Sequence, residues 1–341
     1  MTGKRSPVSP PMPWWLRLSI SLASAVTDAA SRSNGTVNRR LLRFLDPPLP
    51  ATTKPSRGVR SVDLTVDPSR DLWIRVFSPS TDPGDRLPVV VFFHGGGFVF
   101  FSAASRTYND VCRRISLHTH TVVVSVNYRL SPEHPHPASY DDGLAVLRFL
   151  DSGGLDSAFA DDDLDLSSVF LSGDSAGGNI AHHVARRYTG AGSGWNRLKL
   201  AGLVAIQPFF GGEERTPAEI RLRGAPLVSV ERTDWVWKAF LPKGSDRNHP
   251  AAHVTAQAAE IEAEWYPPTV VVIGGFDPLQ DWQRGYCEML KEKGKEVRVV
   301  EYPNAIHAFY AFPEFEETPQ ILEEIKDFIH MHRSKEEERK D

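Results

Sequence analysis

The stretch that decides the fold is VFLSGDSAGGNIAHHVARRY, residues 169–188. It opens with a short apolar run, turns between Gly173 and Gly177, and continues in a helical pattern over Gly178–Tyr188. A G-x-S-x-G turn between a strand and a helix presents its serine, here Ser175, at the helix N-terminus, where free N–H groups favour negative charge. Ser175 is therefore a candidate nucleophile, and an ordinary N-cap serine in a glycine-rich turn is the alternative.

Similar apolar runs recur on both sides of this stretch. Together with the run at 169–171 they cover residues 88–93, 121–126, 203–206 and 269–273. Short runs that are β-branched and apolar throughout predict strands buried on both faces, as in a parallel sheet covered by helices. Helical patterns fill the gaps at Tyr108–His118, Ser139–Leu150, Trp235–Phe240, Asp281–Glu292 and Pro319–His332. The sequence thus predicts an α/β fold with a mostly parallel central sheet and helices on both faces.

The remaining segments precede this pattern or interrupt it. Val59–Val66 and Leu72–Phe77 alternate apolar and polar residues, which predicts two antiparallel strands. Residues 1–50 contain a proline-rich arm, an amphipathic helical pattern over 14–26 and a short basic helix over 38–45. Residues from about 211 to 255 read as an insertion between two core strands. No composition break marks a second core, so we expect one catalytic domain over residues 51–341.

Composition excludes several classes of protein. With 341 residues, 41% hydrophobic residues and a net charge of −4, the chain does not have the composition of a disordered protein. Its 39 Lys and Arg residues do not exceed its 43 Asp and Glu residues, so we expect no nucleic-acid partner. Near-neutrality favours a small uncharged or weakly acidic ligand over a polyanion. Two cysteines, Cys112 and Cys287, cannot build a disulfide framework, which favours a reducing compartment, the cytoplasm or the nucleus.

The apolar stretch near the N-terminus raises the question of a membrane. It covers residues 14–26, is too short to span a bilayer and contains Arg17, so we expect no stable membrane insertion. Lys4 and Arg5 upstream and small residues at 23–25 leave a signal peptide as the alternative to an amphipathic helix. The oligomeric state stays open between monomer and dimer.

A second glycine-rich motif, HGGGF at residues 94–98, follows the apolar run at 88–93. Glycines at that point allow backbone N–H groups to face a ligand atom, and in acyl transfer this atom is the oxyanion of the tetrahedral intermediate. We expect the amides of Gly96, Gly97 and Ala176 to form an oxyanion hole, with Gly95 shaping the turn. A flexible loop or a phosphate loop is the alternative, although no GK[ST] follows. His94 is expected to orient the loop.

A serine nucleophile needs an imidazole base and a carboxylate that orients it, which in this fold class follow the serine in the sequence. His307 follows an alternating strand at 296–302 and the turn Pro303-Asn304, and is the strongest candidate base. Asp277 follows the apolar run at 269–273 and is the candidate acid, with Asp281 as its rival and an Asx turn as the structural alternative. Without a metal-ligand pattern, neither a metal nor a cofactor is expected.

These motifs carry a family resemblance. HGGGF at 94–98, YRLSPEHPHP at 128–137, GDSAGGN at 173–179, GGFDPLQD at 274–281 and the His307 loop together resemble the hormone-sensitive-lipase-like group of α/β hydrolases. The sequence is most similar to plant carboxylesterases and the related gibberellin receptors, including RSNGTVNRRLLRFLD at 32–46 and DWVWKAFLPKGSDRNHP at 234–250. The resemblance implies that residues 1–50 form an N-terminal arm and lid, and that the insertion at about 211–255 lines the pocket.

The resemblance also implies a function. A serine carboxylesterase would use Ser175, His307 and Asp277 to hydrolyse a small ester through an acyl-enzyme. Gibberellin receptors lack the catalytic histidine and have a serine at the position of Gly97, so His307 and Gly97 favour the hydrolase. A receptor-like binding protein, or a lyase or cyclase that uses the same pocket, remains as the alternative.

Overall fold

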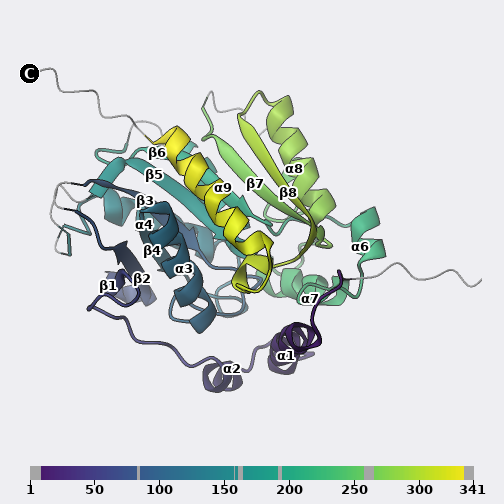
Figure 1. Cartoon of the computed structure of the whole chain (residues 1–341). Helices are drawn as coiled ribbons and strands as arrows, with labels where there is room; N and C mark the ends of the chain where they lie inside the picture. Colours follow the sequence, from purple (N-terminus) through teal and green to yellow (C-terminus); the bar gives the residue numbers. More distant parts are fainter. Residues whose placement is uncertain are drawn as a thin grey trace, which may run out of the picture.

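The computed structural model describes residues 9–82, 85–156, 158–159, 164–190, 194–256 and 265–333. A twisted eight-stranded sheet runs through its centre (Figure 1). The strands are β1 (Val59–Asp67), β2 (Leu72–Pro79), β3 (Leu87–Phe93), β4 (Val122–Asn127), β5 (Leu164–Asp174), β6 (Leu200–Ile206), β7 (Thr269–Phe276) and β8 (Val297–Ile306). They follow the order β1-β2-β4-β3-β5-β6-β7-β8.

Strand pairing confirms the predicted α/β sheet. β2 pairs antiparallel with β1 and β4, and every other neighbouring pair is parallel. The central strand β3 is buried along its whole length, because its valines and phenylalanines lie against helices on both faces. Parallel order brings the C-terminal ends of β3, β5, β7 and β8 to one edge of the sheet, where the motifs follow.

Helices cover both faces of the sheet. One apolar cluster joins the sheet to α4 (Ala138–Asp151), α5 (Ala176–Gly190) and α8 (Gln280–Glu292). A second cluster joins the opposite face to α3 (Arg106–Thr119) and α9 (Glu317–His332). Ridges of apolar side chains such as Ile321, Ile325 and Phe328 on α9 explain why these amphipathic helices pack there.

Several element boundaries differ from the sequence prediction. β5 begins at Leu164, because its first residues continue the pairing with β3 beyond the apolar run. The turn predicted at Pro303-Asn304 is wrong, because β8 continues to Ile306 with a register shift against β7. Helix α5 starts at Ala176, directly after Ser175, rather than at Gly178.

The N-terminal helices α1 (Trp14–Ala30) and α2 (Arg39–Leu45) lie outside the sheet layers, at the end where α7 (Val230–Phe240) also lies (Figure 1). Helix α1 extends four residues past the predicted 14–26 pattern, and its buried apolar residues are Leu16, Ile20 and Ala30. Polar contacts join this segment to the insertion: Arg232 donates to both carboxylate oxygens of Asp28 at 2.7 and 2.6 Å, and the Trp235 indole donates to the Arg32 carbonyl at 3.1 Å.

The short helix α6 (Pro217–Arg221) and α7 both belong to the insertion between β6 and β7. None of the described helices combines the length and apolar character that a bilayer crossing requires. Residues 1–8 of the proline-rich arm lie outside the described residues.

Candidate active site

Ser175 occupies the tight turn between β5 and α5. Its φ is +53°, a left-handed conformation that L-residues rarely adopt, so the turn stores strain at this residue. A Cβ on Gly173 would lie 2.3 Å from the carbonyl oxygen of Gly177, and only glycine permits such an approach. The turn places Ser175 at the N-terminus of a 15-residue helix, where the dipole favours negative charge.

His307 and Asp277 form a buried pair. His307 Nδ1 lies 2.8 Å from Asp277 Oδ2, and the two side chains are 4% and 0% exposed. Asp277 also accepts hydrogen bonds from the Leu279 amide and from the Gln283 side chain, both at 2.9 Å. These donors orient the carboxylate, so Nδ1 carries the shared proton and Nε2 is left as the basic atom.

The rival acid lies elsewhere. Asp281, on the first turn of α8, accepts from the Ala218 amide at 2.8 Å and pairs with Arg284. Its carboxylate therefore connects α8 to α6, whereas Asp277 contacts the histidine.

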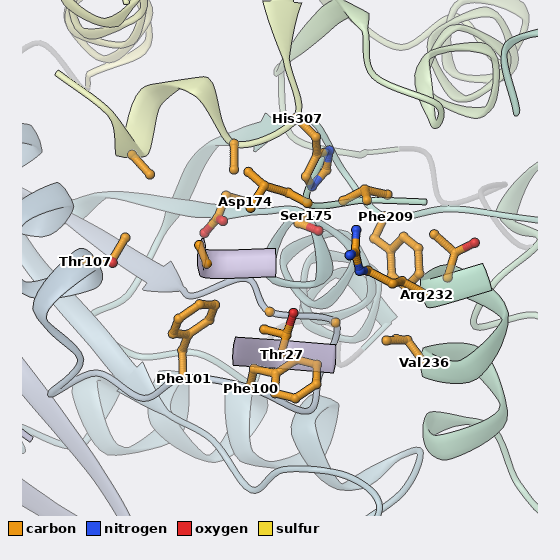
Figure 2. A pocket seen from close by; sticks show the side chains of 18 of the residues that line it. Thr27, Phe100, Phe101, Thr107, Asp174, Ser175, Phe209, Arg232, Val236 and His307 are labelled. Atoms are coloured by element: carbon orange, nitrogen blue, oxygen red, sulfur yellow. The ribbon is translucent and has the colours of Figure 1, made fainter. Parts of the chain in front are cut away.

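Ser175 and His307 line the same cavity, and the His307 ring points toward Ser175 (Figure 2). No hydrogen bond joins these two described side chains. In unliganded hydrolases this contact is often long and closes when the substrate binds. The arrangement therefore brings together the candidate nucleophile, orienting acid and base, which follow one another along the chain in the order Ser, Asp, His.

The glycine loop after β3 lies beside Ser175. Gly96 and Gly97 have φ values of +94° and +61°, and a Cβ on Gly97 would lie 2.8 Å from Val236 Cγ1 on α7. Phe98 anchors the loop by stacking on Phe240 with a ring-centroid distance of 3.7 Å. Among the described residues, the Gly96 and Gly97 amides have no hydrogen-bond acceptor and so can donate to a ligand.

Gly95 has a different role in this loop. Its amide N–H is shared between the Tyr108 hydroxyl at 2.8 Å and Asp174 Oδ1 at 2.9 Å, so it is not available to an oxyanion. Of the four residues proposed for the oxyanion hole, Gly96, Gly97 and Ala176 therefore remain as candidate donors.

His94 begins the glycine loop and is not among the residues that line the cavity beside Ser175. It is fully buried, its Nδ1 contacts the Gly95 carbonyl at 2.8 Å, and its ring stacks on Tyr128. Burial lowers the pKa of the His94 imidazole to about 4, so the ring is neutral near pH 7.

The cavity above Ser175 has a volume of about 470 Å³. It is mostly apolar, and its walls come from α1, the glycine loop, the start of α3, the serine turn, the insertion with the residues just before it, and the loop after β8 (Figure 2). Lining residues include Ala23, Thr27, Phe100, Phe101, Phe209, Val236, Ala308 and Phe312. A cavity of this size and character suits a small ligand with few polar groups. The described residues contain no group of three or more His, Cys, Asp or Glu side chains that could hold a metal.

Sequence reasoning missed several polar residues at the site. Asp174 lies inside the GDSAGG motif, and its position directly before Ser175 could have identified it as a site residue. Gln207 accepts from the Ala308 amide at 2.8 Å and donates to the Ile306 carbonyl at 3.1 Å, which clamps the histidine loop. Gln283 orients Asp277 from α8. No motif marks either glutamine, because each acts across a tertiary contact.

Comparison with known proteins extends this description. A model of the α/β-hydrolase-fold family matches residues 90–311. The gibberellin receptor GID1C of Arabidopsis thaliana is 40% identical over 312 residues, which cover 87% of this chain and 88% of the receptor. Carboxylesterase 20 of the same plant is 35% identical over 288 residues, which cover 80% and 86%.

A solved structure shows the same architecture. An esterase of Pyrobaculum calidifontis superposes with a TM-score of 0.73 at 26% identity, covering 94% of this chain and 99% of the esterase. The eight-stranded sheet, the serine turn after β5, the family match over residues 90–311 and these relatives agree. This chain belongs to the α/β-hydrolase-fold family.

Proposed function

We propose that the protein is a serine carboxylesterase that hydrolyses small carboxylic esters. The observation that carries this proposal is the Asp277–His307 pair, which faces Ser175 beside two glycine amides that have no acceptor among the described residues. Carboxylesterase relatives and esterases of the same fold support it. These comparisons favour ester hydrolysis over other chemistry on the same fold.

In the proposed mechanism His307 Nε2 takes the proton of the Ser175 hydroxyl as Ser175 attacks the ester carbonyl. The amides of Gly96, Gly97 and Ala176 stabilise the oxyanion of the tetrahedral intermediate. Protonated His307 then gives its proton to the departing alcohol, which leaves an acyl group on Ser175. Water, activated by His307, attacks the acyl-enzyme, releases the carboxylic acid and restores the free serine. Asp277 keeps the proton on Nδ1 throughout.

The test is hydrolysis of p-nitrophenyl esters of increasing acyl length by the purified protein. We expect turnover of short esters, and we expect Ser175→Ala to abolish both turnover and covalent labelling by a fluorophosphonate. A wild-type protein that neither turns over esters nor reacts with the fluorophosphonate contradicts the proposal.

A receptor-like function is the second candidate. One observation favours it: the gibberellin receptors are 37–40% identical to this chain, against 32–35% for the carboxylesterases. Tight binding of a small apolar acid without ester turnover favours a receptor. A lyase or cyclase that uses the same pocket is the other alternative, and analysis of the products distinguishes it from an esterase.

We also propose that residues 1–50 act as an arm and lid, and that the protein works in the cytoplasm or the nucleus. Four lining residues on or next to α1, including Thr27 and Asp28, support the lid. Both cysteines are free and buried, which fits a reducing compartment. Deletion of residues 1–46 tests the lid, because it should raise KM far more than it lowers kcat. Imaging of a fluorescent fusion tests the location.

A further inference from the structure

Asp174, the residue before the nucleophile, contacts two other segments of the active site. Its Oδ1 accepts the Gly95 amide at 2.9 Å, at the start of the glycine loop. Its Oδ2 accepts the Tyr108 hydroxyl at 2.8 Å and also the Tyr310 hydroxyl, and Tyr310 lies three residues after His307. One carboxyl group thus joins the serine turn to the glycine loop and to the histidine loop.

The surroundings of Asp174 make this contact unusual. The residue is 1% exposed, and its hydrogen-bond partners among the described residues are neutral donors rather than a Lys or Arg. Burial raises the pKa of the Asp174 carboxyl to about 6, against the opposing effect of the tyrosine hydrogen bonds. A buried carboxyl without a countercharge is unfavourable for stability, so packing alone does not account for it.

The geometry explains what the carboxyl can do. A Cβ on Gly95 would lie 2.4 Å from Asp174 Oδ2, so the loop backbone rests directly against the carboxyl group. Because hydrogen bonds hold the Gly95 amide in place, they also restrict the positions of the Gly96 and Gly97 peptide units that follow it. Tyr108 also donates to the carboxyl while it receives the Gly95 N–H, which closes a small ring of hydrogen bonds.

We propose that Asp174 is a positioning residue that holds the oxyanion loop and the histidine loop in register with Ser175. This inference rests on the proposed ester hydrolysis, because it assigns Asp174 a task in that reaction. Asp174 does not contact the reacting atoms in this scheme; it acts through Gly95 and Tyr310. Since oxyanion donors act mainly in the transition state, loss of their alignment lowers kcat more than it changes KM.

The central test is Asp174→Asn, which keeps the shape but leaves a single acceptor oxygen, so the side chain can no longer accept from the Gly95 amide and both tyrosine hydroxyls. We expect kcat to fall about 10- to 100-fold, less than the roughly 10²- to 10³-fold effect of losing an oxyanion donor outright. KM should change by less than about threefold. The rate of fluorophosphonate labelling of Ser175 should fall with kcat, because that reaction uses the same oxyanion amides.

Asp151→Asn is the matched control. Asp151 is also a buried acid, and it accepts three backbone amides, from Asn196, Arg197 and Leu198, away from the cavity. We expect this variant to lower the melting temperature and to leave kcat and the labelling rate unchanged. If Asp174→Asn behaves like Asp151→Asn, or if it raises KM with kcat intact, the positioning role is wrong.

Tyr310→Phe provides a second variant in case Asp174→Asn does not fold. It removes the hydroxyl that donates to Asp174, so kcat should fall several-fold. Tyr286 is a buried tyrosine that contacts His182, and Tyr286→Phe, as the control, should leave kcat unchanged. When Asp174→Asn and Tyr310→Phe are combined, the two losses of kcat should be less than additive, since both act through the Asp174 carboxyl group. An unchanged kcat and labelling rate in Tyr310→Phe overturns the inference. If the wild type labels but hydrolyses no ester, the esterase proposal fails, while the labelling rates still test Asp174.

Discussion

The start of helix α5 meets the end of strand β3 at Gly177 and Phe93, where a Cβ on Gly177 would lie 1.8 Å from the Phe93 carbonyl oxygen. The strand that carries the glycine loop and the helix that follows Ser175 are therefore in backbone contact. No side chain fits between them, so any residue larger than glycine at this position must move one of the two elements.

Gly177→Ala should accordingly disrupt both stability and catalysis. Overpacking against a backbone atom destabilises by about 1–3 kcal/mol or more, and the shift moves Ser175 relative to the glycine loop. Thermal unfolding and kcat measure the two effects. Gly190→Ala, on the same helix but with no atom within 4 Å of its new Cβ, should behave like the wild type. Wild-type kcat and melting temperature in Gly177→Ala would contradict the close contact.

Gly97→Ala tests the oxyanion loop. Its new Cβ would lie 2.8 Å from Val236 Cγ1, and φ is +61°. We expect kcat to fall by about 10²- to 10³-fold, as for a displaced oxyanion donor. Adding Val236→Ala should restore part of the activity, because it removes the clash and leaves only the φ strain. Gly294→Ala is the control for the backbone strain alone, because Gly294 has φ +69° and an added Cβ would have no atom within 4 Å. We expect this variant to leave kcat unchanged. Full activity in Gly97→Ala excludes this loop as the oxyanion hole.

Asp277→Asn and Asp281→Asn separate the two candidate acids. An asparagine at 277 favours the wrong tautomer of His307, and the equivalent loss in a Ser-His-Asp triad lowers kcat by about 10⁴-fold. Asp281 holds α6 through the Ala218 amide, so Asp281→Asn should lower the melting temperature slightly and leave kcat near wild type. Steady-state kinetics on one short ester distinguish the two. The reverse result would assign the acid to Asp281.

The Arg232–Asp28 pair links the proposed lid to the cavity wall. Both residues line the cavity, and their side chains are 28% and 52% exposed. Such a pair contributes about 1 kcal/mol or less to stability, so Arg232→Met should barely move the melting temperature. It should loosen closure and raise KM by no more than about fivefold, the factor that corresponds to that energy. Arg223→Met, from the more exposed Arg223–Glu231 pair, is the control. An unchanged KM argues against closure through this pair.

Stability should fall as the solution is acidified from pH 6.5 toward pH 4. Burial lowers the pKa of His94 to about 4, so the unfolded chain binds a proton that the folded chain rejects throughout this window. Between pH 7 and pH 5 His94 alone accounts for about 2 kcal/mol of lost stability. The pKa of Asp174, raised to about 6, acts in the opposite direction, because its folded form prefers the proton.

Urea unfolding at the two pH values measures this loss. His94→Gln has no titratable group at this position, so its free energy of unfolding should fall less between pH 7 and pH 5 than that of the wild type. An equal fall in both proteins assigns the acid sensitivity to other groups, of which the buried His182 and His183, with pKa values also lowered by burial, are the first to test.

The sequence predicted the parts of the molecule that depend on local pattern. The apolar runs gave β3, β4, β6 and β7 because central strands of a parallel sheet are apolar on both faces. It placed His307 and Asp277 on the loops after β8 and β7, and the structure brings them within 2.8 Å. Their catalytic role stays a prediction until the variants are measured.

What the sequence did not predict depends on contacts between distant segments. Tyr108 and Tyr310 meet at Asp174 only because α3 and the segment after β8 pack around the same strand ends. A tyrosine in a helical pattern gives no sign of such a partner. The end of β8 was also misplaced, because Pro303-Asn304 has turn propensity, while pairing with β7 keeps this segment extended.

The cavity wall has a consequence for how the protein becomes active during synthesis. Thr27, near the beginning of the chain, and Phe312, near its end, face the same space. In a nascent chain, the serine turn and strand β3 are synthesised well before His307 and Phe312. Helix α1 precedes the serine turn in the sequence, so the cavity that it borders can be enclosed only after β8 and the loop that follows it have been made.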